Sequence, residues 1–401
     1  LFRSCDMIQR LIRWQLIVIL LTGMVSCNTT KQDITLIQSD IDSIGLKWVP
    51  DKREGVSNII IESADDKGLL LKGEVGDIRH KEAVAAYLSV KQISFTDSVV
   101  LLPDTTVNHW ALVAAGYANL RATPRHGAEL ITQAIMGTPV RIMKRDGSWF
   151  YVQTPDNYLG WMTGGSTEVL TTAQMNRWRS ADRLISLENY SLVYADEKEK
   201  AVVCDIAIGS IIEKTSVMAR HLQVVLPDGR TGFVRRSAYA PFDEWLSTTQ
   251  ASVASLESHG RRLMGVPYLW GGTTAFGLDC SGFMKTIFFM NGLILARDAS
   301  LQARHGEPVA GSATDYSQML PGDMIFFGNQ NSKRVGHVGL YLGDGEVIHE
   351  SGMVRVDNLD KSRANYSNYL ATTFLSVRRV LGLPSQPGLV AVREHPWYVN
   401  I

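Results

Sequence analysis

The stretch Pro267-Tyr-Leu-Trp-Gly-Gly-Thr-Thr-Ala-Phe-Gly-Leu-Asp-Cys-Ser-Gly-Phe283 puts a cysteine, Cys280, at the start of a predicted helix. Apolar residues follow at three- and four-residue spacing, and Asn291-Gly292 supplies a stop signal. The first turn of a helix has free N–H groups and the positive end of the macrodipole, which both favour an anion. We therefore expect Cys280 to have a lowered pKa and to act as a nucleophile, rather than as a buried structural thiol.

The composition limits what the chain can do. Its 401 residues are enough for roughly two to four domains. Lysine and arginine together number 40, as do aspartate and glutamate, so the zero net charge gives no support for nucleic acid or an anionic membrane surface as a partner. No group of cysteines and histidines has zinc spacing, and we expect neither a metal nor another cofactor.

The N-terminal residues differ from the rest of the chain. Arginines precede an apolar run from Leu16 to Leu21, which is too short to span a bilayer but suits the core of a secretory signal. The run ends at Met24-Val-Ser-Cys27, which resembles a bacterial lipoprotein signal with a lipidated cysteine. We expect residues 1–27 to be a signal peptide and the protein to lie in the cell envelope, facing the periplasm and held to the membrane only through Cys27. A signal without lipidation is the alternative.

Residues 31–110 have the pattern of a small α+β domain. Strand patterns cover residues 59–61, 69–75 and 93–102, and a helix pattern covers residues 81–88. This segment contains no residue pattern that indicates a chemical function.

An internal repeat occupies residues 111–240. Gly137, Gly160 and Trp161 recur as Gly209, Gly232 and Phe233, each 72 positions later. Short strand patterns separated by turns lie between these marks, and they predict two small barrels of about five strands each, over residues 111–170 and 171–245. The two copies resemble bacterial SH3-like domains.

Residues 246–383 have the pattern of a third, α+β domain. We expect a helix from Leu246 to about Met264, then the helix that begins at Cys280. Strand patterns follow at residues 323–327, 337–342, 346–349 and 372–380. A helix that carries a cysteine and faces an antiparallel sheet with histidines is the arrangement of a papain-like fold. The tail beyond Gly382 has no pattern that assigns it to an element.

Two histidines on neighbouring predicted strands are candidates for the base that a cysteine nucleophile needs. His337 begins one strand, and His349 lies twelve residues later, beyond the Gly343-Asp-Gly345 turn. A tight turn would make these strands antiparallel neighbours, with both rings towards the same helix end. We expect His337 to be the general base and His349 to orient it.

Six short motifs in residues 250–380 together resemble the NlpC-type cell-wall cysteine peptidases. They are Trp270-Gly-Gly, Asp279-Cys-Ser-Gly-Phe283, Arg297-Asp-Ala-Ser300, Pro321-Gly-Asp323, Gly336-His-Val-Gly339 and Ile348-His349. The resemblance implies a triad of Cys280, His337 and His349, in agreement with the assignment from the residues alone. It also implies that Tyr268 lies near the oxyanion.

Tandem SH3-like domains before this peptidase domain are similar to the γ-D-glutamyl-L-diamino-acid endopeptidases that recycle wall peptides. That resemblance implies cleavage after γ-D-Glu in stem peptides with a free N-terminal L-Ala, read by an ammonium pocket between the first barrel and the peptidase domain. The residues implied for substrate binding are Glu129, Tyr158, Trp270, Asp279, Ser281 and Asp298. A carboxylate pair and a phenol can satisfy the three donors of an ammonium group.

The sequence therefore predicts a monomeric cysteine peptidase of peptidoglycan-derived peptides. One alternative is an endopeptidase on intact peptidoglycan, with the barrels as wall-binding modules. A second is a non-catalytic wall-binding lipoprotein, for which the intact Cys280, His337 and His349 would be unnecessary. Acyl transfer instead of hydrolysis is a third, because the same thioester serves both reactions.

Overall fold

The computed structural model describes residues 31–104 and 108–400, so the expected signal peptide and its lipidation site, Cys27, lie outside the described residues. Contacts divide the chain into two units. Residues up to Lys52 and Val56–Leu102 form the first, while Arg53–Gly55 and the chain from Pro103 onwards form the second. Within the described residues, no helix is both long and apolar enough to cross a membrane.

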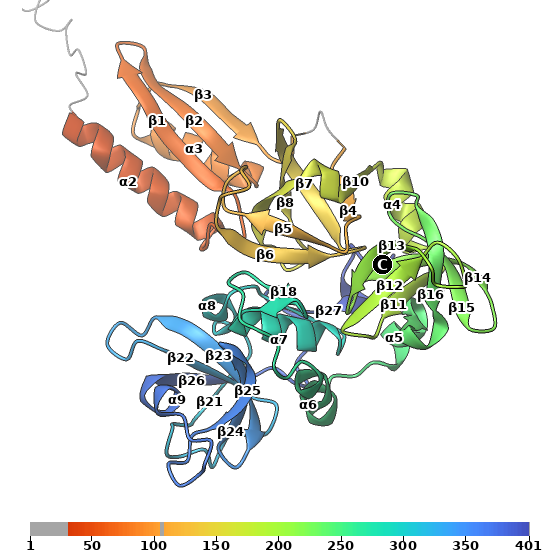
Figure 1. The fold of residues 1–401 in the computed structure, drawn as a ribbon. Helices are drawn as coiled ribbons and strands as arrows, with labels where there is room; N and C mark the ends of the chain where they lie inside the picture. The colour runs from red at the N-terminus through yellow and green to blue at the C-terminus, as the bar shows by residue number, and fades with distance from the viewer. Residues whose placement is uncertain (1–30, 105–107, 401) are drawn as a thin grey trace, which may run out of the picture. The chain divides into compact units, whose positions relative to one another are not determined.

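The first unit is a small α+β domain, as predicted (Figure 1). Its elements are α2 (Lys31–Trp48), β1 (Ser57–Asp65), β2 (Gly68–Val75), α3 (Ile78–Val90) and β3 (Phe95–Leu101). Strand β2 pairs antiparallel with β1 and parallel with β3, and α3 makes the crossover that a parallel pair requires. Asp77 caps α3 by accepting a hydrogen bond from the N–H of Arg79. The helix α2 was not predicted from the sequence.

The second unit begins with two SH3-like sheets. The first contains β4 (Trp110–Val113), β5 (Tyr117–Arg121), β6 (Leu130–Ile135), β7 (Pro139–Asp146), β8 (Trp149–Gln153), β9 (Leu159–Thr163) and β10 (Thr167–Leu170). The second contains β11 (Arg183–Ser186), β12 (Tyr190–Tyr194), β13 (Val202–Ala207), β14 (Ile211–Val217), β15 (His221–Val225), β16 (Thr231–Arg235) and β17 (Tyr239–Pro241). Each sheet therefore has seven strands, not the five expected.

The 72-residue repeat is confirmed as a structural repeat. Strands β7, β8 and β9 begin 72 residues before β14, β15 and β16, and a 3₁₀ turn follows the third strand in both copies. Gly137 and Gly209 precede the first of these strands with φ of 78° and 81°, a left-handed conformation that favours glycine. A helix follows each sheet, α4 (Thr172–Arg179) and α5 (Phe242–Thr248).

The remaining residues form a papain-like α+β domain around a six-stranded antiparallel sheet, in the order β21-β26-β22-β23-β24-β25. The strands are β21 (Glu307–Val309), β22 (Met324–Gly328), β23 (Val335–Gly343), β24 (Glu346–Ser351), β25 (Met353–Asn358) and β26 (Phe374–Arg379). The helices are α6 (Val253–Arg262), α7 (Cys280–Phe289), α8 (Ala299–Gln302) and α9 (Asn368–Thr373), and β18 (Thr273–Thr274) pairs with β19 (Gly277–Leu278). The single helix expected over residues 246–264 is wrong, because α5 ends at Thr248 and Ser252 caps a new helix, α6.

The C-terminal tail packs within the second unit. Its strand β27 (Leu389–Ala391) pairs with β20 (Leu293–Leu295), and the 3₁₀ turn Val392–Glu394 follows. Beyond it, His395 contacts the carbonyl of Pro155 in the first barrel at 3.0 Å, and Arg183 of the second barrel donates to the carbonyl of Tyr398. The tail therefore links the peptidase domain to both barrels.

Candidate active site

Cys280 is the first residue of α7, as the sequence predicts. Asp279 caps this helix, with its Oδ1 accepting from the N–H of Gly282 at 2.7 Å. The thiol is 6% exposed and belongs to the core between α7 and the sheet. The backbone N–H groups of Val338 and Ser281 face the sulfur and favour its anionic form. Because Val338 follows His337 directly, this contact holds β23 against the nucleophile.

The expected lowering of the Cys280 pKa is wrong for this structure. Burial raises the pKa of the thiol to about 12, and the Asp279 carboxylate acts in the same direction. Burial also lowers the pKa of His337 to about 3, assisted by the charge of the neighbouring His349. At neutral pH both the thiol and the His337 imidazole are therefore uncharged. The free N–H groups of the helix start do not offset the desolvation of a thiolate at this depth.

His337 and His349 lie together on the neighbouring strands β23 and β24. The connecting turn has Asp344 and Gly345 at φ of 48° and 79°, the pair of positive angles that a tight type I′ hairpin needs. This turn puts Gly339 opposite His349, so the two histidines lie on a diagonal of the hairpin. Their ring nitrogens, Nε2 of His337 and Nδ1 of His349, are 2.8 Å apart.

A third group, Asp357, extends this pair. Nε2 of His349 is 3.2 Å from Oδ2 of Asp357, and the carboxylate also accepts a hydrogen bond from Arg355 at 2.8 Å. Burial alone would raise the pKa of Asp357, but hydrogen bonds from His349 and Arg355 bring it below its usual value. Asp357 therefore carries a negative charge at the end of the series His337, His349 and Asp357.

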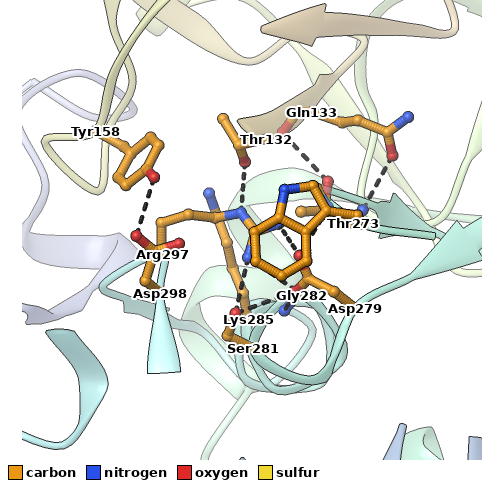
Figure 2. Close-up of polar contacts among 12 residues, drawn as sticks. Thr132, Gln133, Tyr158, Thr273, Asp279, Ser281, Gly282, Lys285, Arg297 and Asp298 are labelled. Atoms are coloured by element: carbon orange, nitrogen blue, oxygen red, sulfur yellow. Dashed lines mark hydrogen bonds and ion pairs between the residues drawn. The ribbon is translucent and has the colours of Figure 1, made fainter. Parts of the chain in front are cut away.

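Asp279 and Arg297 form a buried ion pair beside Cys280. Nη1 and Nη2 of Arg297 lie 3.0 and 2.6 Å from the two carboxylate oxygens of Asp279. The same guanidinium contacts Ser281 Oγ at 2.9 Å and Thr132 Oγ1 of the first barrel at 2.8 Å (Figure 2). Burial would raise the pKa of Asp279, but Arg297 and backbone N–H groups lower it. The sequence analysis gave Arg297 no role, although it lies in one of the quoted motifs.

The expected substrate residues Asp279 and Ser281 are thus brought together. The Asp279 carboxylate also accepts from the N–H of Gly271 at 2.9 Å and from the hydroxyl of Ser281 at 3.1 Å. With its cap and its two bonds to Arg297, it holds the helix start and the preceding loop in place. Asp279 therefore has a structural role as the N-cap of α7, and substrate binding by Asp279 stays a prediction.

Glu129 and Trp270 meet across the first barrel and the peptidase domain. The indole Nε1 of Trp270 donates to Oε1 of Glu129 at 2.9 Å. Glu129 is exposed, and the Trp270 side chain is 61% exposed. A carboxylate has about four acceptor positions, so Glu129 keeps several for a ligand.

Tyr158 and Asp298 form a second contact between the first barrel and the peptidase domain. The Tyr158 hydroxyl donates to Oδ2 of Asp298 at 2.9 Å, and the ring is buried (Figure 2). Burial and then the Asp298 charge raise the pKa of this phenol. Since its only proton goes to Asp298, the phenol oxygen can still accept a hydrogen bond from an ammonium group.

Tyr268 lies near Cys280, and its place at the oxyanion, which the resemblance implies, stays a prediction. Its pKa is raised, first by burial and then by its electrostatic interactions with Cys280 and Asp279, so it remains a neutral hydrogen-bond donor. Its side chain is 41% exposed and is accessible to a ligand. Tyr369 also lies at this site, with its ring centroid 5.9 Å from that of His337.

Buried polar contacts fix the first barrel on the peptidase domain. The amide of Gln133 accepts from the Thr273 N–H at 3.0 Å (Figure 2). Lys285 of α7 lies 2.6 Å from Asp156. Burial would raise the pKa of Asp156, but the charge of Lys285 lowers it. The site residues of the first barrel are therefore held in a fixed position relative to those of the peptidase domain.

Two family models match the chain. The NlpC/P60 family model matches residues 265–379, and a model described as the bacterial dipeptidyl-peptidase Sh3 domain matches residues 120–165. The first range contains the cysteine and both histidines of the site. The second contains Glu129 and Tyr158.

The chain is also similar to characterised relatives and to a solved structure. It is 30% identical to the γ-D-glutamyl-L-lysine dipeptidyl-peptidase of Bacillus subtilis, over 54% of this chain and 71% of the relative. It is 29% identical to dipeptidyl-peptidase 6 of Lysinibacillus sphaericus, over 67% of this chain and 98% of the relative. The crystal structure of an NlpC/P60 family protein from Bacillus cereus shares the fold, with a TM-score of 0.58, 23% identity and coverage of 68% of this chain and 99% of that one.

Proposed function

Since the chain belongs to the NlpC/P60 family of cysteine peptidases, we propose that it hydrolyses the bond between γ-D-Glu and a diamino acid. The proposed substrate is a peptidoglycan-derived peptide with a free N-terminal L-Ala. The names of the relatives, γ-D-glutamyl-L-lysine dipeptidyl-peptidase and dipeptidyl-peptidase 6, support this choice.

The contact between Glu129 and Trp270 carries the proposal. It places the exposed carboxylate of Glu129, from the first barrel, against Trp270 of the peptidase domain. Trp270 lies ten residues before Cys280 in the chain. An ammonium group is the ligand that a carboxylate with open acceptor positions favours. In this proposal, a peptide whose amine binds here places only a short N-terminal part before the scissile bond. A blocked or glycan-linked amine would be rejected by steric exclusion and by lost hydrogen bonds.

The proposed reaction begins at the Cys280 thiol. His337 takes the thiol proton as the sulfur forms a bond to the γ-carbonyl carbon of D-Glu. The resulting oxyanion is stabilised by backbone N–H groups at the start of α7 and by the Tyr268 hydroxyl. His337 then gives the proton to the departing amine of the diamino acid, the C–N bond breaks, and a thioester remains.

Water completes the cycle. His337 removes a proton from water as the water oxygen bonds to the thioester carbon. The C–S bond then breaks, the protonated His337 returns its proton to the departing sulfur, and L-Ala-γ-D-Glu leaves with the thiol restored. During both steps a positive charge develops on His337. The carboxylates of Asp357 and Asp279 stabilise that charge and act against the effect of burial on the pKa of His337, and His349 links His337 to Asp357 by hydrogen bonds.

Product analysis tests the proposal. Purified enzyme and its Cys280→Ala variant are incubated separately with L-Ala-γ-D-Glu-diaminopimelate and with intact sacculi, and the products are identified by mass spectrometry. We expect L-Ala-γ-D-Glu and free diaminopimelate from the tripeptide with wild type alone, and little release from sacculi. Equal or faster release from sacculi would contradict the proposal and favour an endopeptidase of the intact wall. Transfer of the dipeptide to an added amine, without hydrolysis, would favour acyl transfer.

A further inference from the structure

The short segment Arg53–Gly55 belongs to the second unit. The residues before and after it, Lys52 and Val56, belong to the first unit. The backbone of the segment is tied to the first barrel: the N–H of Leu159 donates to the Arg53 carbonyl at 2.8 Å, and the Gln153 amide donates to the Glu54 carbonyl at 3.2 Å. The segment therefore has a defined place beside Tyr158.

The Arg53 side chain reaches the candidate substrate site. Its Nη1 lies 2.6 Å from Oδ2 of Asp298 and 3.1 Å from Oγ of Ser300. The same carboxylate oxygen accepts the hydrogen bond from Tyr158. Arg53, Tyr158 and Asp298 form one corner of the site. The Arg53 and Asp298 side chains are 35% and 27% exposed, so this corner is open to solvent.

Arg53 changes the electrostatic character of this corner. Without Arg53, the Asp298 carboxylate would present a negative charge, which repels an anion. The guanidinium neutralises Asp298, and its planar fork of five N–H donors can hold two carboxylates at once. The corner therefore suits a carboxylate that enters from solvent.

The proposed substrate has a carboxylate in the matching part of its chain. Linkage through the γ-carbonyl leaves the α-carboxylate of D-Glu free, in the same residue as the scissile carbonyl and separated from it by the α-carbon and two methylene groups. This group and the N-terminal amine are the only charges before that bond. Glu129 offers the complement of the amine. Arg53 is connected to Cys280 through Asp298 and the adjacent Arg297–Asp279 pair.

We propose that Arg53 binds the free α-carboxylate of the γ-linked glutamate, and so makes the enzyme select against peptides in which this group is amidated to isoglutamine. The inference rests on the proposed function. Arg53 lies outside both residue ranges that the family models match. Amidation removes the charge and leaves the guanidinium facing a neutral amide, which weakens a charge-assisted hydrogen bond.

A pair of substrates that differ only at this group tests the inference. Values of kcat and KM are measured for L-Ala-γ-D-Glu-diaminopimelate and its isoglutamine counterpart with wild type, Arg53→Gln, Arg53→Lys and the control Lys52→Gln. We expect wild type and the control to prefer the glutamate peptide by about 10- to 100-fold in kcat/KM. Arg53→Gln should lose most of this preference through a higher KM for the glutamate peptide alone, and Arg53→Lys should retain part of it.

Two results would overturn the inference. One is an equal loss on both peptides with Arg53→Gln, which would make Arg53 a structural link. The other is an unchanged preference. Calorimetric binding of L-Ala-γ-D-Glu and L-Ala-γ-D-isoglutamine to the Cys280→Ala protein, with and without Arg53→Gln, separates this question from catalysis. Absence of cleavage of both tripeptides by wild type would refute the proposed function, whereas the dipeptide affinities would still decide the role of Arg53.

Discussion

Nε2 of His337 lies 2.8 Å from Nδ1 of His349, and the far nitrogen of His349 lies 3.2 Å from the Asp357 carboxylate. Asp357 has no proton to donate, so Nε2 of His349 must carry one. Nδ1 of His349 is then the acceptor for the proton on Nε2 of His337. This network assigns the tautomers and leaves Nδ1 of His337 as the nitrogen that can accept the thiol proton.

Asp357→Asn should reverse the tautomers of His349 and His337 while leaving the positions of the three side chains unchanged. The Asn amide can donate to His349 and favour the opposite tautomer, which would leave His337 with the wrong nitrogen protonated. We expect kcat to fall by about 100-fold, within the range of general acid–base catalysis, with little change in KM. The matched control is Arg355→Gln, which removes the other partner of Asp357. Steady-state kinetics would contradict the tautomer assignment if Asp357→Asn retained the wild-type kcat.

The raised pKa of Cys280 predicts how the thiol responds to pH. With a pKa of about 12, the thiol is protonated across the neutral range, and its thiolate fraction should rise about tenfold per pH unit. The rate of inactivation by iodoacetamide should therefore keep increasing from about pH 5 to about pH 9. The measurement uses a Cys204→Ser background, which removes the other described thiol. A rate that is constant over this range would indicate a thiolate–imidazolium pair instead.

Arg297→Met should destabilise the second unit strongly, because it leaves the buried Asp279 carboxylate without its cation. The expected loss is about 3–5 kcal/mol in the free energy of unfolding, read from urea denaturation. Adding Asp279→Asn should recover part of the loss, since Asn retains the helix cap without the charge. A double variant less stable than Arg297→Met would contradict this account.

The same ion pair has a defined pH dependence. The pKa of Asp279 is lower in the folded than in the unfolded protein, so the stabilisation is present above the ordinary aspartate pKa. It is lost as the pH falls through the lower, folded-state value. Arg297→Met should therefore flatten the decline of stability with acid, compared with wild type.

Local sequence patterns predicted the parts of the site that depend on local structure. The helix start at Cys280 follows from the Asp-Cys-Ser-Gly order and the apolar spacing after it. The neighbouring strands of His337 and His349 follow from the Gly343-Asp-Gly345 turn, because a tight hairpin fixes the register. The barrel repeat was predicted from identical spacing, although the short additional strands of each sheet have too few residues for a clear period.

Properties that depend on tertiary packing were not predicted. Asp357 lies on β25, whose pairing with β24 after Gly352 was not recognised from the sequence. The Cys280 pKa depends on burial by the sheet, which the helix-start argument leaves out. The helix α2 was missed, and Arg53 reaches Asp298 across 245 positions of the chain, a contact that no local pattern encodes. The assignments of Glu129 and Tyr158 depended on the resemblance alone.

The most direct test of the central claim compares L-Ala-γ-D-Glu-diaminopimelate with its N-acetylated form, using wild type and Glu129→Gln. Acetylation removes the charge that Glu129 is proposed to bind, so wild type should cleave the acetylated peptide at least about 100-fold less efficiently in kcat/KM. Glu129→Gln should lose most of its activity on the free peptide and show a much smaller difference between the two. Equal cleavage of both peptides by wild type would contradict the amine-reading site and the dipeptide-releasing function built on it.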